Sequence, residues 1–482
     1  MESAVLVLNH RPWSTNFDRM STQSTEPPEE ENEGGSRSSL IISSLFCAIW
    51  GVFLALQLSD PDGPWAFPQT MLQVCVISIV IWQVCDPFAD AAQWVGVRFR
   101  LPGSVRGATL DAVASSMPEL FSGIFFVVLA LQTVSSGDAD LAARERITAA
   151  AEGYGATIAT CAGSAVYNMI LIPAFCALVI SFVRPARPTI DVEDEVISRD
   201  GVWFLSTQIL LIMFLYQEKM MWWMGVCLLA VYTVYIAQLY FDAKRYQRCM
   251  DFLGGHLKEH GADTPIPDVI AAAAEQRLRL NANIVLCAQQ AYGCDADEDA
   301  TDDSAGLFFG YVNVRLSGPV AAAILLVATL IAAAACYFLV EATMETAAIL
   351  EVPTFFVAVI LAAAASSVPD TFLAIAAARR GDDSGAVSNA FGSNIFDICI
   401  CLSIPLLVNS WMTDWQPVSL LQDGRPIPGI VGLRVLLVFL TVVNLAIMWH
   451  ERQITRFKAV VMCGLYIVFV AYAVLGSLGF IS

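Results

Sequence analysis

The chain has 482 residues, of which 57% are hydrophobic and 15% are charged, and its formal net charge is −19. Soluble globular proteins contain about 45–50% apolar and about 25% charged residues, so this composition excludes an ordinary soluble protein and predicts an integral membrane protein. The negative charge argues against a nucleic-acid partner and leaves the lipid bilayer as the expected surroundings.

Eleven apolar stretches are long enough for membrane helices, which need about 20 residues each. In chain order they are Leu40–Leu58, Met71–Val97, Gly107–Val134, Tyr154–Val183, Val202–Tyr216, Met221–Phe241, Tyr311–Val340, Ala347–Ala378, Gly385–Leu407, Ile430–Met448 and Ala459–Leu478. The strand alternation of a membrane barrel is absent from the sequence. The sequence therefore predicts an all-α membrane protein.

The first 39 residues form a polar tail, which is too polar for a signal peptide. Residues 40–58 are interpreted as an extra transmembrane helix, with a cleaved signal anchor as the alternative. Because no presequence is evident, we favour the plasma membrane over endomembranes.

Lys and Arg are unevenly divided between alternate loops. With the N-terminus inside, inner segments hold 21 of these residues and outer segments hold only four, namely Arg144, Arg146, Lys219 and Arg425. The excess of positive charge on the cytoplasmic side of membrane proteins then predicts this orientation.

A duplication is visible after the first span. Five spans (71–241) precede a polar cytoplasmic segment (242–310), and five more (311–480) follow it. SSMPE (115–119) is matched by SSVPD (366–370), and GSAVYN (163–168) is matched by GSNIFD (392–397). Each half has an odd number of spans, so the halves are inverted in the membrane, an arrangement typical of transporters with a site at midplane. The predicted fold is an inverted 5+5 transmembrane-helix repeat with one extra N-terminal helix.

The central polar segment contains an acidic run, CDADEDATDDSAG (294–306). Ala300 stands where an EF-hand loop requires glycine, and Gly306 stands where it requires glutamate. We interpret the run as a solvated acidic loop, with a weak regulatory cation site as the alternative. The thirteen cysteines are scattered without CxxC spacing and are interpreted as buried, unreactive thiols.

The paired motifs place many oxygen atoms together. Pro118 and Pro369 lack an N–H, so the carbonyls of Ala114 and Ala365 lose their helix partners. Each motif also puts a hydroxyl and, four residues on, a carboxyl or carboxamide on one helix face. These pairs are Ser115 with Glu119, Ser164 with Asn168, Ser366 with Asp370, and Ser393 with Asp397. Together they predict an all-oxygen cage for a hard cation such as Ca²⁺, which takes about 6–8 oxygen ligands, and not a zinc or copper site.

Three of these groups, Glu119, Asp370 and Asp397, are carboxyls at membrane depth. A charged carboxylate there costs at least about 2.5 kcal/mol on insertion scales. No Lys or Arg lies in the motifs, so bound cations are the expected partners. The alternative is that the acids stay protonated as packed or proton-relay groups. Asp86 and Asp90, near the inner end of the second span, are interpreted either as lining an ion pathway or as a solvated helix end.

The motifs resemble those of a known family. SSVPDT followed by GSNIFDI resembles the second signature repeat of K⁺-dependent Na⁺/Ca²⁺ exchangers, in the Ca²⁺/cation antiporter superfamily. Four further stretches are similar to sequences of this family: GAT (107–109), SMPELF, GSAVYN and VCD (84–86). The resemblance implies alternating access, with Na⁺ entry driving Ca²⁺ export and K⁺ co-exported, and implies neither enzymatic activity nor a cofactor.

The resemblance also implies roles for individual residues. Glu119 and Asp370 would be the principal Ca²⁺ and Na⁺ ligands, and Asp397 matches the position associated with K⁺ dependence. Five further residues would complete the cage: Ser115, Ser164, Asn168, Ser366 and Ser393.

The sequence departs from the family pattern in three places. Ala114-Ser115 stands where the family has a Gly-containing pair, the first outer hairpin is long, and no His lies near either repeat, unlike the proton-driven branch. A K⁺-independent or proton-driven antiporter of the same superfamily is therefore the alternative. A membrane enzyme fits less well, because an aspartic dyad does not require this symmetric set of serines and there is no GxSxG motif. The sequence predicts no oligomeric state.

Overall fold

The computed structural model describes residues 37–289 and 304–478, except 62, 100, 102, 133–138, 186, 193–195, 262, 279, 281, 283–284, 287, 380, 382, 423–424 and 428. Residues 1–36 of the predicted polar tail and residues 294–303 of the acidic run lie outside these residues, and residues 37–39 of the predicted tail belong to the first helix.

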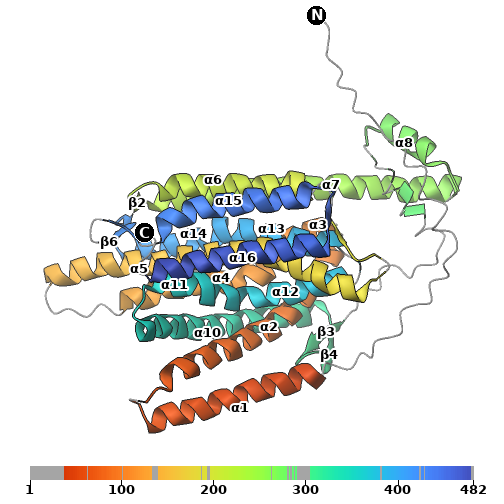
Figure 1. The fold of residues 1–482 in the computed structure, drawn as a ribbon. Coiled ribbons are helices and arrows are strands. Elements are labelled where there is room, and N and C mark those ends of the chain that lie inside the picture. Colours follow the sequence, from red (N-terminus) through yellow and green to blue (C-terminus); the bar gives the residue numbers. More distant parts are fainter. Residues whose placement is uncertain are drawn as a thin grey trace, which may run out of the picture.

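Long helices running along one direction form a single bundle (Figure 1). Helix α1 (Arg37–Ser59) precedes the repeats. The first repeat comprises α2 (Ala66–Arg98), α3 (Gly103–Arg106), α4 (Ala112–Gln132), α5 (Ala139–Val183), α6 (Val202–Leu215) and α7 (Trp222–His260). The second comprises α10 (Gly318–Leu350), α11 (Thr354–Val357), α12 (Ala363–Arg379), α13 (Asp383–Phe396), α14 (Ser403–Met412), α15 (Ile430–Trp449) and α16 (Arg456–Ser477).

Ten helices in the described part of the chain are long and apolar enough to cross a membrane, and they overlap ten of the eleven predicted spans. The remaining predicted span, Val202–Tyr216, falls on α6, which has 14 residues. Such a helix is about 21 Å long, shorter than the hydrocarbon core of about 30 Å. It continues from a π-helical segment, η3 (Val196–Gly201), which contains the charged pair Arg199-Asp200. In Figure 1, α6 runs beside α15 within the bundle.

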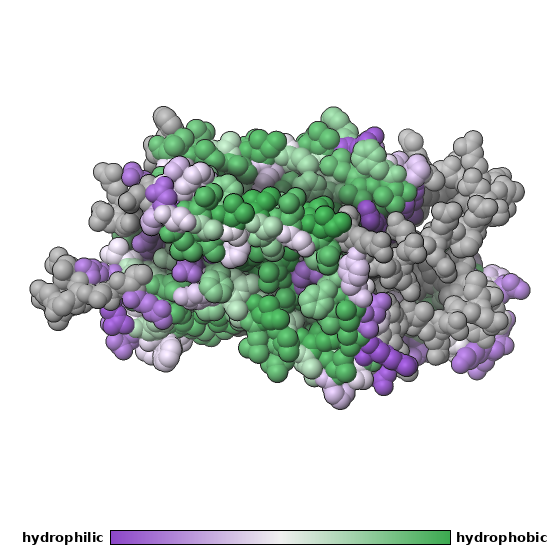
Figure 2. Space-filling model, turned by 90° about the horizontal axis from the view of Figure 1, so that it is seen from below, coloured by the Kyte–Doolittle hydropathy of each residue, from purple (hydrophilic) through white to green (hydrophobic). Residues whose placement is uncertain are grey.

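The surface is consistent with a lipid environment. Figure 2 shows hydrophobic residues over the middle of the visible face and hydrophilic residues towards the ends of the helices. Large apolar side chains such as Leu326, Val435 and Phe439 are exposed on the helices of the bundle. Water would not favour such a band, whereas hydrocarbon chains would. The chain is therefore a multi-pass membrane protein.

The central polar segment contains more structure than its composition predicts. Helix α7 extends through His260, well past the predicted end of its span at Phe241. Helix α8 (Ile266–Glu275) packs on this extension through Leu253 and Val269. Residues 311–317 do not begin a membrane helix as predicted, because β4 (Val312–Arg315) pairs there with β3 (Ser304–Leu307).

Two small strand pairs connect the repeats. β1 (Ile190–Asp191) pairs with β8 (Gln453–Ile454), and β2 (Lys219–Met220) pairs with β5 (Val418–Ser419). β1 lies between the third and fourth helical regions of the first repeat, and its partner β8 lies between the fourth and fifth of the second. For β2 and β5 the two positions are exchanged. Inversion of the two halves requires this exchange, so the pairs agree with the inverted duplication. The remaining short pair, β6 (Leu421–Gln422) with β7 (Arg425–Pro426), is local.

π-helical segments mark equivalent places in both repeats. η2 (Gly107–Asp111) and η4 (Ala358–Ala362) each end four residues before the first serine of the repeated proline motif. A further one, η5 (Asp397–Cys401), begins at a predicted ligand, whereas the equivalent stretch from Asn168 in α5 is α-helical. Such segments are frequent at functional sites, and the sequence analysis did not predict them.

Gly163 lets α5 approach η4 closely. A Cβ at this position would lie 2.2 Å from the carbonyl oxygen of Val359 and 2.6 Å from the Cβ of Ala363. The backbone oxygen cannot move without displacing η4, so only glycine fits here. This contact sets the distance between a helix of the first repeat and a helix of the second.

We expect Gly163→Ala to destabilise the protein by about 1–3 kcal/mol, the usual cost of overpacking. The midpoint of thermal unfolding of the purified protein in detergent would measure this loss. Gly51→Ala in α1 is the matched control, because nothing lies within 4 Å of its added methyl group. Equal midpoints for both variants would contradict the close approach.

Candidate cation-binding site

The two copies of each motif meet inside the bundle. Helices α4 and α5 contribute the first-repeat residues, and α12, α13 and η5 contribute those of the second. Eight predicted side chains are at most 1% exposed: Ser115, Glu119, Ser164, Asn168, Ser366, Asp370, Ser393 and Asp397. The site is thus screened from both lipid and water.

Ser164 connects groups from both repeats. Its hydroxyl lies 3.0 Å from Glu119 Oε1, 3.1 Å from Asp397 Oδ2 and 3.0 Å from the Ser367 hydroxyl. The Asn168 amide donates to the same oxygen at 3.3 Å. A hydroxyl has one proton to donate, so it can serve only one of the two carboxylates at a time. The other carboxylate then receives no proton from Ser164 and is open to a cation or to another donor.

Ser393 has the equivalent role in the second repeat. Its hydroxyl donates to Asp370 Oδ2 at 3.4 Å and lies 2.6 Å from the Ser115 hydroxyl. The Ser116 hydroxyl donates to it at 3.0 Å. Ser393 therefore bonds the acid of its own repeat and both serines of the other repeat's pair, whereas Ser164 contacts only the second serine of its opposite pair, Ser367.

Ser116 and Ser367 were missed in the sequence analysis. They are the second serines of the repeated pairs, and they contact Ser393 and Ser164 at the same distance, 3.0 Å. Ser367 also donates to Glu119 at 3.4 Å. The repeated doublet was visible in the sequence, but i,i+4 spacing selected only the first serine of each pair.

Ser366 interacts with Glu119 of the other repeat and also bonds within its own helix. Its hydroxyl donates to the carbonyls of Ala362 and Ala363 in its own helical segment. Ala114 and Ala365 are buried within the same two helices as the acids, and the use of their carbonyls as ligands stays a prediction. The proline of each motif lies inside a continuous helix.

Four buried oxygen atoms in the site have no hydrogen-bond partner. They are Glu119 Oε2, Asn168 Oδ1, Asp370 Oδ1 and Asp397 Oδ1, one from each carboxyl or carboxamide of the cage. A buried polar atom without a partner costs about 1–3 kcal/mol, and more if it is charged. None of the ion pairs found among the described residues involves these acids. The arrangement therefore suits cations, which can bind these oxygens directly.

The oxygen types point to a hard cation held by mixed ligands. Among the described residues no three His, Cys, Asp or Glu side chains cluster as a metal centre. Hydroxyl and amide oxygens must therefore supply much of the coordination. Na⁺, K⁺ and Ca²⁺ accept such neutral oxygen ligands, whereas zinc and copper favour imidazole and thiolate.

The sequence left two interpretations for Asp86 and Asp90. In the structure, Asp90 accepts a hydrogen bond from the backbone N–H of Gly306 at 3.2 Å. It is therefore covered by the β3–β4 hairpin and does not end a freely solvated helix. The prediction that both acids line an ion pathway stays untested.

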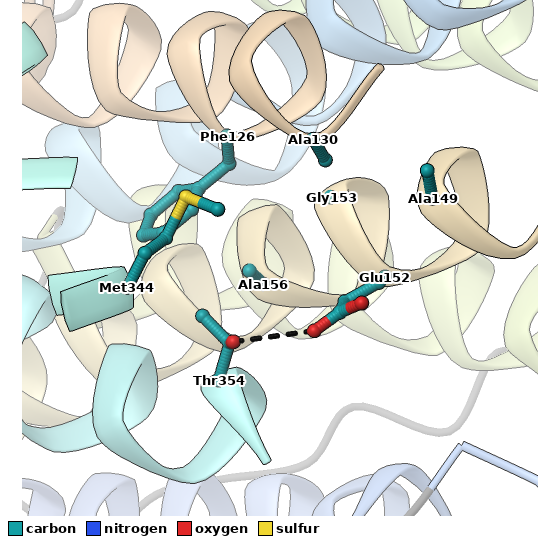
Figure 3. A pocket seen from close by; sticks show the side chains of 8 residues that line it. All are labelled: Phe126, Ala130, Ala149, Glu152, Gly153, Ala156, Met344 and Thr354. Atoms are coloured by element: carbon teal, nitrogen blue, oxygen red, sulfur yellow. Dashed lines mark hydrogen bonds between the residues drawn. The ribbon is translucent and has the colours of Figure 1, made fainter. Parts of the chain in front are cut away.

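A pocket of about 70 Å³ lies between α4, α5, α10 and α11, on the predicted outer side of the cage (Figure 3). Glu152 lies in its wall and accepts a hydrogen bond from Thr354 at 3.3 Å, which joins the two repeats. Glu152 is twelve residues before Ser164 in α5, about 18 Å along the helix. The pocket therefore adds a carboxylate outside the cage that the sequence analysis did not identify.

An ion pair and a hydrogen bond hold the start of α13 at the predicted inner end. Arg184, after α5, pairs with Asp383 at 2.6 Å. Asp200 in η3 is bonded by Arg199 at 2.7 Å and by the Ser388 hydroxyl at 3.1 Å. Burial raises the pKa of Asp383 above its ordinary value, although Arg184 opposes this shift. The helix that leads to Ser393 and Asp397 is thereby anchored to the first repeat.

Comparisons with known proteins agree with this arrangement. The family model described as "Sodium/calcium exchanger protein" matches residues 70–241 and 320–475, more than half of the chain. Human sodium/potassium/calcium exchanger 4 is 30% identical over 162 residues, which are 33% of this chain and 22% of that protein. Human sodium/potassium/calcium exchanger 3 is 30% identical over 165 residues, 34% of this chain and 21% of that protein. Each match thus spans about a fifth of the relative's length.

A solved structure shares the fold. The crystal structure of the H⁺/Ca²⁺ exchanger CAX superposes with a TM-score of 0.54 at 14% identity, covering 92% of this chain and 91% of that one. At this identity the likeness shows the all-α membrane fold and nothing about the ions carried.

We expect Ser164→Ala to weaken Ca²⁺ binding about tenfold or more, because the change removes a hydroxyl shared by two acids and hydrogen bonds to charged groups are worth about 1.5–3 kcal/mol. The Ca²⁺ concentration that half-maximally raises the unfolding temperature would measure the change. Thr160→Ala is the control, since the Thr160 hydroxyl bonds only the Ala156 carbonyl one turn away. If both variants kept the half-maximal Ca²⁺ concentration of the unmodified protein, Ser164 would not belong to the site.

Proposed function

Because this chain belongs to the sodium/calcium exchanger family, we propose that it is a secondary active antiporter that exchanges Na⁺ for Ca²⁺ by alternating access, with co-transport of K⁺. The observation that carries the proposal is the set of four unpartnered oxygens from Glu119, Asn168, Asp370 and Asp397 in one buried site. Two inverted repeats supply these oxygens equally. An inverted pair of half-sites at midplane is suited to opening towards either side in turn.

The charge of the site supports exchange over one-way flow. Three buried carboxyls without a Lys or Arg partner are costly when ionised and empty. The site is therefore most stable when it holds Ca²⁺ or Na⁺ in each direction of its cycle. This penalty on the empty, ionised state couples the outward movement of one cation to the inward movement of the other.

The proposal of K⁺ coupling is based on the position at which the paired ligands differ in charge. Asp397 stands where the first repeat has Asn168, so the two half-sites contain two carboxyls on one side and one on the other. Three carboxylates balance the charge of one Ca²⁺ and one K⁺. The names of the relatives, which include potassium, support the same assignment.

The surrounding structure suggests a route and a location. The pocket at Glu152 lies on the outer side of the cage, where its carboxylate attracts cations before they reach Glu119 (Figure 3). We place the protein in the plasma membrane, with the α7 extension and α8 in the cytoplasm. No catalytic chemistry is assigned to it.

The second candidate is proton-driven or K⁺-independent cation exchange at the same site. The hydroxyls of Ser164 and Ser393, within hydrogen-bond distance of Glu119, Asp397 and Asp370, favour it. A protonated carboxyl can take the place of a bound cation in such a network. Flux that follows a pH gradient without Na⁺ would support this candidate.

The deciding experiment is uptake of labelled Ca²⁺ into vesicles loaded with Na⁺, with external K⁺ present or replaced by an inert cation. We expect uptake to require both internal Na⁺ and external K⁺. Uptake that ignores K⁺ would leave Na⁺/Ca²⁺ exchange in place and remove the role of K⁺. Uptake that ignores Na⁺ would contradict the proposed exchange.

We expect Asp370→Asn to reduce this uptake at least about a hundredfold, because a neutral amide cannot replace a carboxylate that compensates a divalent cation. The amount of inserted protein is measured in parallel. Glu341→Gln is the control, since Glu341 is an exposed acid on α10, away from the cage. Normal Na⁺-dependent uptake by Asp370→Asn would refute the assigned role of this residue.

Asp397→Asn makes the two repeats alike at this position. We expect the variant to retain Na⁺-dependent Ca²⁺ uptake and to lose most of its stimulation by K⁺, because one negative charge fewer leaves K⁺ uncompensated. The ratio of uptake with and without external K⁺ measures the effect. A ratio equal to that of the unmodified protein would show that K⁺ is bound elsewhere.

A further inference from the structure

The β3–β4 hairpin docks on α2 at the predicted inner side of the bundle. Its strands pair from Ser304 with Arg315 to Leu307 with Val312. Two backbone N–H groups of the hairpin donate to α2 side chains, Gly306 to Asp90 at 3.2 Å and Phe309 to Gln83 at 2.7 Å. The hairpin is therefore latched to α2 at two places about two helical turns apart.

Buried apolar contacts support the same docking. Ala305 is 0% exposed and Leu316 is 6% exposed, and both pack with Ala91 of α2. The turn itself is strained, because Phe308 and Phe309 both have left-handed φ angles, of 52° and 59°. Such backbone costs energy in residues other than glycine and persists where surrounding contacts hold it. The contacts of Phe309 with α2 can supply that support.

A row of aromatic rings leads from the hairpin to α12, the helix that contains Asp370. The Phe309 ring meets the Trp82 ring edge-on, with centroids 5.5 Å apart. Trp82 stacks on Phe372, with centroids 4.0 Å apart and planes 12° from parallel. Phe372 is two residues after Asp370 on α12. The three rings thus connect the hairpin, α2 and the helix that holds one of the cage acids.

We propose that Phe309, Trp82 and Phe372 form an aromatic relay through which the β3–β4 hairpin positions Asp370 for cation binding. These are positioning residues, since none of the cage oxygens belongs to them. The inference rests on the proposed function for its substrate, Ca²⁺, but its geometry is independent of which ion drives transport.

The relay has a definite physical basis. Helix α2 contributes none of the predicted cage residues, so its influence on the site must pass through packing. Asp370 is fully buried, and displacement of α12 by a fraction of an ångström changes its distance to a bound cation. Aromatic pairs contribute modestly beyond their buried area, and loss of one stacked pair corresponds to about a two- to tenfold change in affinity.

The test compares Phe309→Ala, Trp82→Ala and the double variant in the vesicle assay. We expect each single variant to raise the KM for Ca²⁺ about two- to tenfold, with kcat per inserted protein changed less than twofold. Because both rings act through one path, the double variant should raise KM no more than the larger single variant does. Trp82→Phe, which keeps a ring against Phe372, should restore most of the affinity.

Phe308→Ala is the matched control. Phe308 is the neighbouring residue in the same turn, also with a left-handed φ, but its ring is 69% exposed. Its KM should equal that of the unmodified protein. An equal rise in KM for Phe308→Ala, additive effects in the double variant, or an unchanged KM for Trp82→Ala would each overturn the relay.

Failure of the relay and failure of the proposed function give different results. If the unmodified protein takes up Ca²⁺ in exchange for Na⁺ while the variants keep its KM, only the relay is wrong. If the unmodified protein shows no such uptake, the proposed function is wrong. The relay is then judged by the Ca²⁺ concentration that half-maximally stabilises the purified protein, which should shift by the same two- to tenfold factor.

Discussion

Three carboxyls buried at membrane depth without a cationic side chain are the constraint on which this structure depends. Glu119, Asp370 and Asp397 are each at most 1% exposed. The protein meets part of their need for polar partners with serine hydroxyls and leaves one oxygen of each acid free. A fully satisfied network would bind no ion, and a fully unsatisfied one would not be stable in the folded protein. Because the hydrogen bonds to the acids are incomplete, a cation can bind the remaining oxygens and so complete the site.

The duplicated architecture gives this balance to both sides of the membrane. Ser164 and Ser393 each bond the acid of their own repeat and at least one serine of the other, so neither half-site is complete alone. The exchanged strand pairs β1–β8 and β2–β5 tie the repeats at opposite ends of the bundle. The close approach at Gly163 fixes the distance between them near the cage. Rigid scaffolding around a two-sided site is what an alternating-access cycle requires.

The elements without cage residues also have a part in this design. Helix α2 faces the second repeat, and the hairpin before α10 is latched onto it. Trp82 contacts Phe309 of that hairpin and also Phe372, which lies on the helix that contains Asp370. The hairpin is thereby connected, by packing alone, to the helix that contains a proposed oxygen ligand. At the other end, the hydrogen bond from Thr354 to Glu152 joins the repeats beside the outer pocket.

The sequence by itself determined the membrane class, ten of the spans, the inverted repeat and the eight motif side chains that are buried together inside the bundle. Hydrophobic length and i,i+4 spacing are local properties, so they can be read along the chain. Only the tertiary structure decided that Ser116 and Ser367 contact the opposite repeat, that Ser366 bonds its own helix, and that Asp90 is covered by a hairpin. These outcomes depend on how each helix is rotated about its axis and on which distant segment packs against it. The π-helical segments, which shift that rotation just before the paired serines, left no signal in hydropathy or spacing.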